Sequence, residues 1–158
     1  MTDMISPDAT SPAERRRLLD ILISQSSSPH LSDLETYRRV LAQRNRLLKD
    51  AGPRLRSNPG QLEAWDSQLA ESGARIISDR LATLASIEPK AKTYYEKISS
   101  ESETLSLSYH GTVVSGDPDR RRSDLVEALR ARRDDEIRLG HTLSGPHRDH
   151  RRRARDWR

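Results

Sequence analysis

Residues 33–52 read DLETYRRVLAQRNRLLKDAG, and this stretch predicts a long amphipathic helix. Ser32-Asp33-Leu34-Glu35 has the form of a capping box, which places the start of the helix near residue 33. Gly52-Pro53 follows the last apolar residue and ends the helix near residue 51. The apolar side chains that recur at helical spacing are Leu34, Tyr37, Leu41 and Leu48, with Val40 and Leu47 beside them.

A second, longer helix is predicted over residues 62–87, and it extends for about 39 Å. Pro89 is expected to kink this helix or to start a new one, and the apolar stripe then continues to Ser99. The loop of about ten residues between the two long helices allows a return, so we expect them to pack as an antiparallel pair. The apolar residues of the second helix are Leu62, Trp65, Leu69, Ile76, Ile77, Leu81, Leu84 and Ile87.

Shorter elements are predicted on either side of the pair. Ser11-Pro12-Ala13-Glu14 is a capping box that opens a helix to about Ser24, and residues 1–10 form an irregular lead-in. Alternation predicts a strand over residues 104–109, and residues 111–122 form a polar loop. Ser123 caps a further helix that ends at Gly140, and residues 142–145 begin a second short strand. The predicted fold is therefore mainly α with a minor β component (α+β).

The composition limits the classes of function that are available. The chain has 158 residues, of which 33% are hydrophobic and 33% are charged, and it has no cysteine, which excludes disulfides and thiolate metal sites. Residues 145–158 contain six Arg and two Asp and thus carry the whole net charge of +4, so residues 1–144 sum to zero. The body of the chain therefore does not have the charge of a strongly basic nucleic-acid-binding domain.

Four motifs, in a fixed order along the chain, together resemble those of a known protein family. Residues 11–20, SPAERRRLLD, resemble a family stretch in which a small-Pro turn leads into Glu-Arg-Arg-Arg and a Leu-Asp pair. Residues 37–49, YRRVLAQRNRLLK, resemble its helix Tyr-x-x-Val-Leu-x-Gln-Arg-Asn-x-Leu-Leu-Lys. The third motif comprises Leu62, Trp65-Asp66, Gln68-Leu69 and Gly73, and the fourth comprises Gly140, Thr142-Leu143 and Gly145-Pro146-His147-Arg148-Asp149.

These four motifs resemble the RecF family of bacterial DNA replication and repair proteins. The resemblance implies that residues 11–149 form the helical lobe of an ABC-type, SMC-like ATPase head. In that family the Walker A loop lies upstream of this region, and the signature and Walker B motifs lie downstream. The chain contains no Gly-x-x-x-x-Gly-Lys-Ser/Thr. We therefore expect no enzymatic activity and no cofactor in this chain, whereas ATP and magnesium belong to the full-length family.

The resemblance also implies a biological role and partners. The family binds single-stranded or gapped DNA, supports DNA recombination, recombinational repair and the SOS response, and works with mediators of the RecR and RecO type. It implies a cytoplasmic protein without membrane contact, and we expect the chain to be a monomer. The alternative is a stand-alone helical module whose paired helices dock a partner protein. A Walker A coding sequence directly upstream of the gene, in any frame, would favour the first reading.

Several arginines are candidate contacts for DNA phosphates, namely Arg15, Arg16, Arg17, Arg38, Arg39 and Arg44. The alternative for each is a solvated helix face on which the Arg stems pack. Trp65, Tyr94 and Tyr95 are candidate base-stacking residues, but their helical spacing favours core packing. The motif Gly145, Pro146, His147, Arg148 and Asp149 is expected to position the chain near the nucleotide site of the family's head; a metal site there, shared with His150, is disfavoured by Pro146.

The last residues depart from the family pattern, which continues after Asp149 into an apolar strand. Residues 150–158 instead read HRRRARDWR, and we expect a disordered, non-native tail from a truncated or frameshifted gene. Any DNA binding by the chain is expected to be weak, independent of sequence and confined to this tail, so that removal of residues 150–158 abolishes it.

Overall fold

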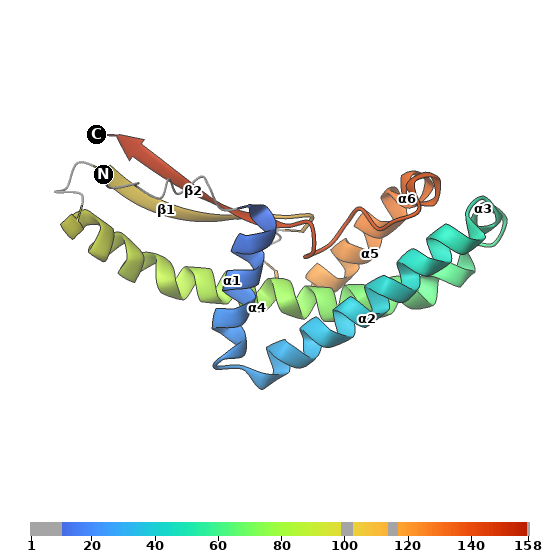
Figure 1. Ribbon diagram of the computed structural model, residues 1–158, viewed down its shortest axis with the longest axis horizontal. Helices are drawn as coiled ribbons and strands as arrows, with labels where there is room; N and C mark the ends of the chain where they lie inside the picture. The colour runs from blue at the N-terminus through green and yellow to red at the C-terminus, as the bar shows by residue number, and fades with distance from the viewer. Residues whose placement is uncertain (1–10, 99–102, 114–116, 158) are drawn as a thin grey trace, which may run out of the picture.

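The computed structural model describes residues 11–98, 103–113 and 117–157, so the predicted lead-in over residues 1–10 lies outside the described residues. Helices dominate the described part and one two-stranded sheet completes it, which confirms the mainly α fold with a minor β component (Figure 1). The elements in chain order are α1 (Pro12–Ser24), α2 (Ser28–Ala51), α3 (Arg54–Ser57), α4 (Gly60–Ile98), β1 (Glu103–His110), α5 (Arg121–Ala131), α6 (Arg133–Leu139) and β2 (His150–Trp157).

The helices α2 and α4 form the predicted antiparallel pair, and the short α3 lies at the turn between them (Figure 1). Leu34, Tyr37 and Val40 of α2 pack against Leu69 and Ile76 of α4 in one buried cluster. A second cluster closes the end of the pair near α3 and consists of Leu48, Leu55, Leu62 and Ile137. The apolar stripes of the two helices thus face each other.

None of the helices in the described part of the chain combines the length and the apolar character that a membrane span requires.

The helix α2 begins at Ser28, four residues before the predicted capping box. Ser27 is the N-cap, and its hydroxyl accepts a hydrogen bond from the amide of His30 at 3.3 Å. Pro29 does not break the helix, because a proline in the first turn lacks only an N–H that would have no partner inside the helix. The earlier start adds a turn that carries His30 into the interior, where its side chain is fully buried.

The helix α4 continues through Pro89 to Ile98, so the predicted end at residue 87 is wrong. Its 39 residues extend for about 58 Å. Beyond Pro89 few side chains pack against the helix, and the exposed fraction is 67% for Tyr94 and 81% for Ile98. The expected core packing of Tyr94 is therefore wrong, whereas Trp65 packs against the cluster between α2 and α4.

The strands β1 and β2 pair antiparallel, with Glu103 opposite Trp157 and His110 opposite His150. The strand β1 confirms the prediction over residues 104–109, and it lies beside the last turns of α4 (Figure 1). Its inward side chains include Leu105 and Tyr109, which are buried. The expectation of a disordered tail is wrong for residues 150–157, because their backbone forms the second strand.

The region after β1 differs from the prediction in three places. The helix predicted from Ser123 to Gly140 is two helices, α5 and α6, which meet at Arg132. The first of them begins at Arg121, and the Ser123 hydroxyl donates to the Arg120 carbonyl instead of capping the helix. Gly140 ends α6 in the left-handed conformation, as predicted, with φ of 72°. Residues 142–145 are irregular and form no strand.

Candidate functional site

The irregular segment over residues 142–149, TLSGPHRD, lies between α6 and β2 and is held by side chains from distant elements. Amides that would otherwise bond to a neighbouring strand donate to side chains instead. The amide of Thr142 donates to Asn45 at 2.8 Å, and that of Leu143 donates to Glu136 at 2.7 Å. The amide of Gly145 donates to the Thr112 hydroxyl at 2.9 Å. These bonds explain why the segment forms no strand although its composition predicts one.

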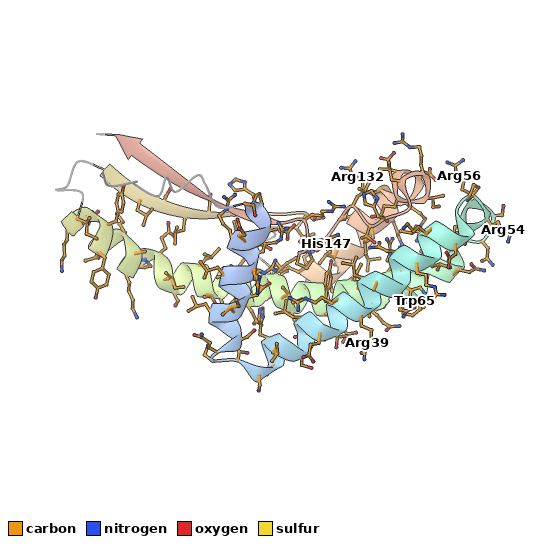
Figure 2. All side chains as sticks on the ribbon, in the orientation of Figure 1. Arg39, Arg54, Arg56, Trp65, Arg132 and His147 are labelled. Atoms are coloured by element: carbon orange, nitrogen blue, oxygen red, sulfur yellow. The ribbon has the colours of Figure 1, made fainter. Side chains whose placement is uncertain are left out.

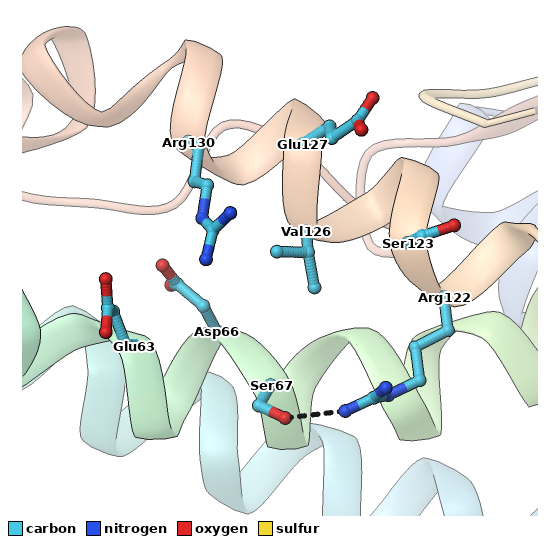
Figure 3. Close-up of a pocket in the computed structure, with 8 residues that line it drawn as sticks. All are labelled: Glu63, Asp66, Ser67, Arg122, Ser123, Val126, Glu127 and Arg130. Carbon is cyan, nitrogen blue, oxygen red and sulfur yellow. Dashed lines mark hydrogen bonds between the residues drawn. The ribbon is translucent and has the colours of Figure 1, made fainter.

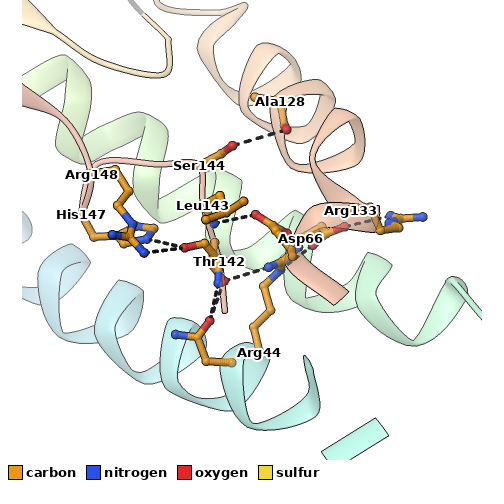
Figure 4. A network of polar contacts seen from close by, with 11 residues as sticks. Arg44, Asp66, Ala128, Arg133, Thr142, Leu143, Ser144, His147 and Arg148 are labelled. Atoms are coloured by element: carbon orange, nitrogen blue, oxygen red, sulfur yellow. Dashed lines mark hydrogen bonds and ion pairs between the residues drawn. The ribbon is translucent and has the colours of Figure 1, made fainter. Parts of the chain in front are cut away.

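A fully buried arginine, Arg44, anchors the start of this segment (Figure 4). Its Nε donates to Asp66 at 2.7 Å, and its Nη2 donates to Glu136 at 2.7 Å. Its Nη1 donates to the hydroxyl of Thr142 at 2.8 Å. Asp66 also pairs with Arg133 at 3.0 Å. One guanidinium therefore joins α2, α4, α6 and the TLSGPHRD segment.

Because Arg44 is fully buried and paired, its predicted role as a DNA contact is wrong. A charged side chain survives in the interior only when it is paired and hydrogen-bonded, and this one has both kinds of partner. The sequence holds a signal that the prediction did not use. Arg44 lies four residues after Val40 and four before Leu48, so it falls on the apolar face of α2.

A second buried arginine, Arg80, anchors the middle of the segment at Pro146. Its Nε and Nη2 each donate to the carboxylate of Asp20 at 2.8 Å, and its Nη1 donates to the carbonyl of Pro146 at 2.8 Å. Although burial alone would lower it, the pKa of Arg80 is raised by the hydrogen bonds and charge of Asp20. His30 lies between Asp20 and Asp79, with nitrogen–oxygen distances of 3.5 and 2.8 Å. Apart from Pro146, none of these residues was predicted as part of a site.

Asp149, the last residue of the segment, holds it against β1. Its carboxylate accepts hydrogen bonds from the Tyr109 hydroxyl and the Thr112 amide, both at 2.8 Å, and burial raises its pKa. Its carbonyl accepts a bond from Nη1 of Arg16 at 2.7 Å. A Cβ at Gly111 would come within 2.5 Å of the same carboxylate, so only glycine lets β1 approach so closely.

The imidazole of His147 is fixed by two hydrogen bonds. Its Nε2 lies 3.3 Å from the carbonyl of Thr142, which can only accept, so Nε2 carries the proton. Nδ1 must then accept the bond from the Tyr37 hydroxyl at 2.7 Å. Burial lowers the pKa of His147 to about 4, so the ring is neutral at pH 7. Both nitrogens are used within the protein, and His147 therefore holds the segment rather than offering a free ligand.

A hollow of about 260 Å³ opens between α1 and α2, beside this segment. We call it the α1–α2 hollow. Arg16, Arg17 and Arg38 line it, so the structure brings together three of the predicted arginines. Arg15 and Arg39 do not line it, and Arg39 extends from the outer side of α2 (Figure 2). Its other lining residues are Ala13, Asp20, Leu34, Tyr37, Leu41, Ile76, Arg80, Pro146 and His147.

Other arginines are scattered over the surface. Arg54, Arg56 and Arg132 lie at the far end of the helix pair (Figure 2). A second hollow, of about 310 Å³, lies between α4 and α5, and Arg122 donates to Ser67 at 2.9 Å within it (Figure 3). Its three acidic residues, Glu63, Asp66 and Glu127, outnumber Arg122 and Arg130, so its charge does not favour an anion.

Comparison with known proteins gives one consistent result. No family model matches the chain. Curated proteins named "DNA replication and repair protein RecF" are similar to 88–94% of it: 37% identity over 142 residues in Bacillus pumilus, 38% over 142 in Bacillus subtilis and 38% over 158 in Chloroflexus aggregans. The chain spans only 38–39% of the length of these relatives.

Solved structures agree with this similarity. Two structures of the recombination mediator protein RecF in the RecFOR pathway, one with ATP and one described as RecF-ATPrS, match 96% of the chain at 28% identity. The TM-scores are 0.83 and 0.85, and the match covers 42% of each solved chain.

Proposed function

We propose that this chain, which corresponds to one part of the RecF-family proteins, serves as the helical lobe of a DNA replication and repair protein. The observation that supports this most strongly is the clamping of the TLSGPHRD segment by Arg44 and Arg80. Two buried arginines on the two long helices reach one irregular segment, Arg44 at Thr142 and Arg80 at Pro146. Such an arrangement is costly to build without a function for the segment that it fixes.

The fixed segment would serve the nucleotide site of a complete head. The chain has no phosphate-binding loop of the form Gly-x-x-x-x-Gly-Lys-Ser/Thr, and a phosphate cradle of that kind needs glycine amides, a lysine and a hydroxyl for magnesium. ATP and magnesium would therefore be bound by other parts of a full-length protein. The role of this chain would be to hold Gly145–Asp149 rigidly toward them.

DNA contact is proposed for Arg16, Arg17 and Arg38, which share the α1–α2 hollow, and for the arginines of residues 150–158. Arginines bind phosphates through charge and through a planar fork of donors. The hollow adds a second route for DNA beside the tail. In the cell, this binding would support recombinational repair and the SOS response, together with mediators of the RecR and RecO type.

A pair of titrations on the intact chain tests the proposal. Fluorescence anisotropy should detect binding of single-stranded or gapped DNA at about 0.05 M salt, because counterion release favours the complex there. A labelled ATP with magnesium should show no saturable binding at micromolar concentration. Saturable ATP binding, or the absence of any DNA binding at low salt, would contradict the proposal.

One observation favours the alternative, a stand-alone module that docks a partner protein. Leu18, Ile21 and Leu22 lie at successive positions of one face of α1, and they are 60%, 46% and 47% exposed. Exposed apolar side chains at this spacing are typical of a helix that packs against another protein element. A Walker A coding sequence immediately upstream of the gene would identify that element as the remainder of a RecF-type head, and its absence would favour the module.

A further inference from the structure

We propose that the α1–α2 hollow is a binding site for a phosphate group, supplied either by a nucleic-acid backbone or by a nucleotide. The site itself follows from the residues that line the hollow. Only the identity of the phosphate as part of DNA rests on the function proposed above.

The charge of the hollow favours an anion. Arg16 and Arg17 of α1 face Arg38 of α2 across it. The fourth lining arginine, Arg80, is neutralised by Asp20, the acidic residue of the lining. Among the described residues, no carboxylate lies within ion-pair distance of Arg17 or Arg38. Three positive charges therefore remain without an acidic partner in the hollow.

Arg16 is the most buried of these three arginines, and several of its N–H donors remain for a ligand. Its Nη1 donates to the Asp149 carbonyl, and its guanidinium makes no second hydrogen bond within the described residues, which leaves donors for a ligand. Burial, and then the positive charge of Arg80, lower the pKa of Arg16, whereas the charges of Asp149, Tyr109 and Asp20 raise it. A phosphate between the two helices would offset the repulsion between Arg16 and Arg80 and accept the planar donor forks of several arginines.

The walls and the size of the hollow select a small charged group. Leu34, Leu41, Ile76 and Pro146 supply apolar walls, which strengthen the field of the arginines by excluding water. His147 is neutral and has no ring nitrogen left to offer. The volume of about 260 Å³ lies below the roughly 300 Å³ at which pockets for drug-sized ligands begin. A phosphate therefore fits inside, and the rest of a nucleotide or strand would lie outside.

Occupancy of the hollow would also fasten α1 to α2. Residues 25–27 join these two helices, and α1 carries the arginines of one side whereas α2 carries Arg38 on the other. A phosphate bound to both sides binds the folded state only, so it must stabilise the fold. This gives a measurement that does not depend on DNA or on activity.

The test compares thermal unfolding of the intact chain in sodium phosphate and in sodium chloride at one ionic strength. Phosphate at ten times its dissociation constant should raise the Tm by about 3–6 °C. Arg38→Gln and Arg17→Gln should each remove most of this rise. Arg39→Gln is the matched control: it removes the same charge from the neighbouring exposed position and should keep the rise. An equal rise in all four proteins, or no rise in the parent chain, would overturn the site.

Two further arms identify the source of the phosphate. Single-stranded DNA should compete with inorganic phosphate for the hollow. Competition by ATP alone would sustain the site, assign the phosphate to a nucleotide and contradict the proposed function. A phosphate response without DNA binding would sustain the site and contradict the proposed DNA-binding function. If phosphate does not raise the Tm, and Arg38→Gln binds DNA as tightly as the parent chain, the site is overturned and the proposed DNA-binding function stands.

Discussion

The Tyr37 hydroxyl donates a hydrogen bond of 2.7 Å to Nδ1 of His147, and this bond ties the centre of α2 to the TLSGPHRD segment. The two rings lie with their centroids 5.9 Å apart. Tyr37 is buried, and burial raises its pKa far above the ordinary value, so the hydroxyl keeps the proton that it donates. The segment is therefore held at Thr142 by Arg44, at Pro146 by Arg80 and at His147 by Tyr37.

Gly145→Ala should lower the free energy of unfolding by about 1–3 kcal/mol or more. Gly145 has φ of 126°, a conformation that alanine rarely adopts, and a Cβ there would collide with the Tyr37 hydroxyl. Urea unfolding measures the loss. In a double variant with Tyr37→Phe the collision is relieved, so the combined loss should be smaller than the sum of the two single losses. Strictly additive losses would show that the two residues are not coupled.

Arg44→Ala should destabilise the fold by about 3–5 kcal/mol, because it leaves the buried carboxylate of Glu136 without its cation. Glu136 loses its charged partner, whereas Asp66 keeps Arg133. Arg39→Ala, on the exposed side of the same helix, should change stability by no more than about 0.5 kcal/mol. The buried network would be disproved as a source of stability if the two variants unfolded at the same urea concentration.

The stability of the fold should fall as the pH falls through the range in which His147 titrates. An imidazole in the unfolded chain has a pKa near ~6.5, whereas burial lowers the pKa of folded His147 to about 4. Between these values the unfolded state binds the additional proton, so stability is lost at up to about 1.4 kcal/mol per pH unit. His147→Gln keeps one donor and one acceptor without titrating. The parent should lose about 2 kcal/mol more than this variant between pH 7 and pH 5; equal losses would contradict the assignment.

Replacement of Arg151, Arg152, Arg153 and Arg155 by Gln should weaken binding of single-stranded DNA and reduce its salt dependence. Substitution is preferable to removal of residues 150–158, because truncation would also remove β2 and leave β1 unpaired. Anisotropy titrations at several salt concentrations measure the effect. If affinity at about 0.15 M salt is unchanged, the expectation that DNA binds through the tail is wrong.

The long helices could be predicted because their apolar residues recur at helical spacing within one continuous stretch. The site could not, because its partners are far apart in the chain: Arg44 meets Asp66, Glu136 and Thr142 at separations of 22, 92 and 98 residues. No local pattern encodes such a meeting. The position of Arg44 on an apolar face was the one local signal of its burial.

The errors in the predicted boundaries have a common physical cause. The sequence predicts a kink or a new helix at Pro89, but α4 continues to Ile98, and the neighbouring Glu88 accepts a hydrogen bond from the amide of Leu107 in β1. Residues 142–145 were read as a strand, but their amides donate to Asn45, Glu136 and Thr112. In each case tertiary contacts outweighed a correct local preference.

The salt dependence of single-stranded DNA binding tests the central claim, that the helical lobe contacts DNA phosphates through the α1–α2 hollow. The logarithm of the binding constant should be measured against the logarithm of salt concentration for the parent, for Arg17→Gln combined with Arg38→Gln, and for Arg39→Gln, all with the tail intact. The double variant should show a slope smaller in magnitude by about 1.4, since each lost phosphate contact removes roughly 0.7, and Arg39→Gln should match the parent. Equal slopes for the parent and the double variant would contradict the account.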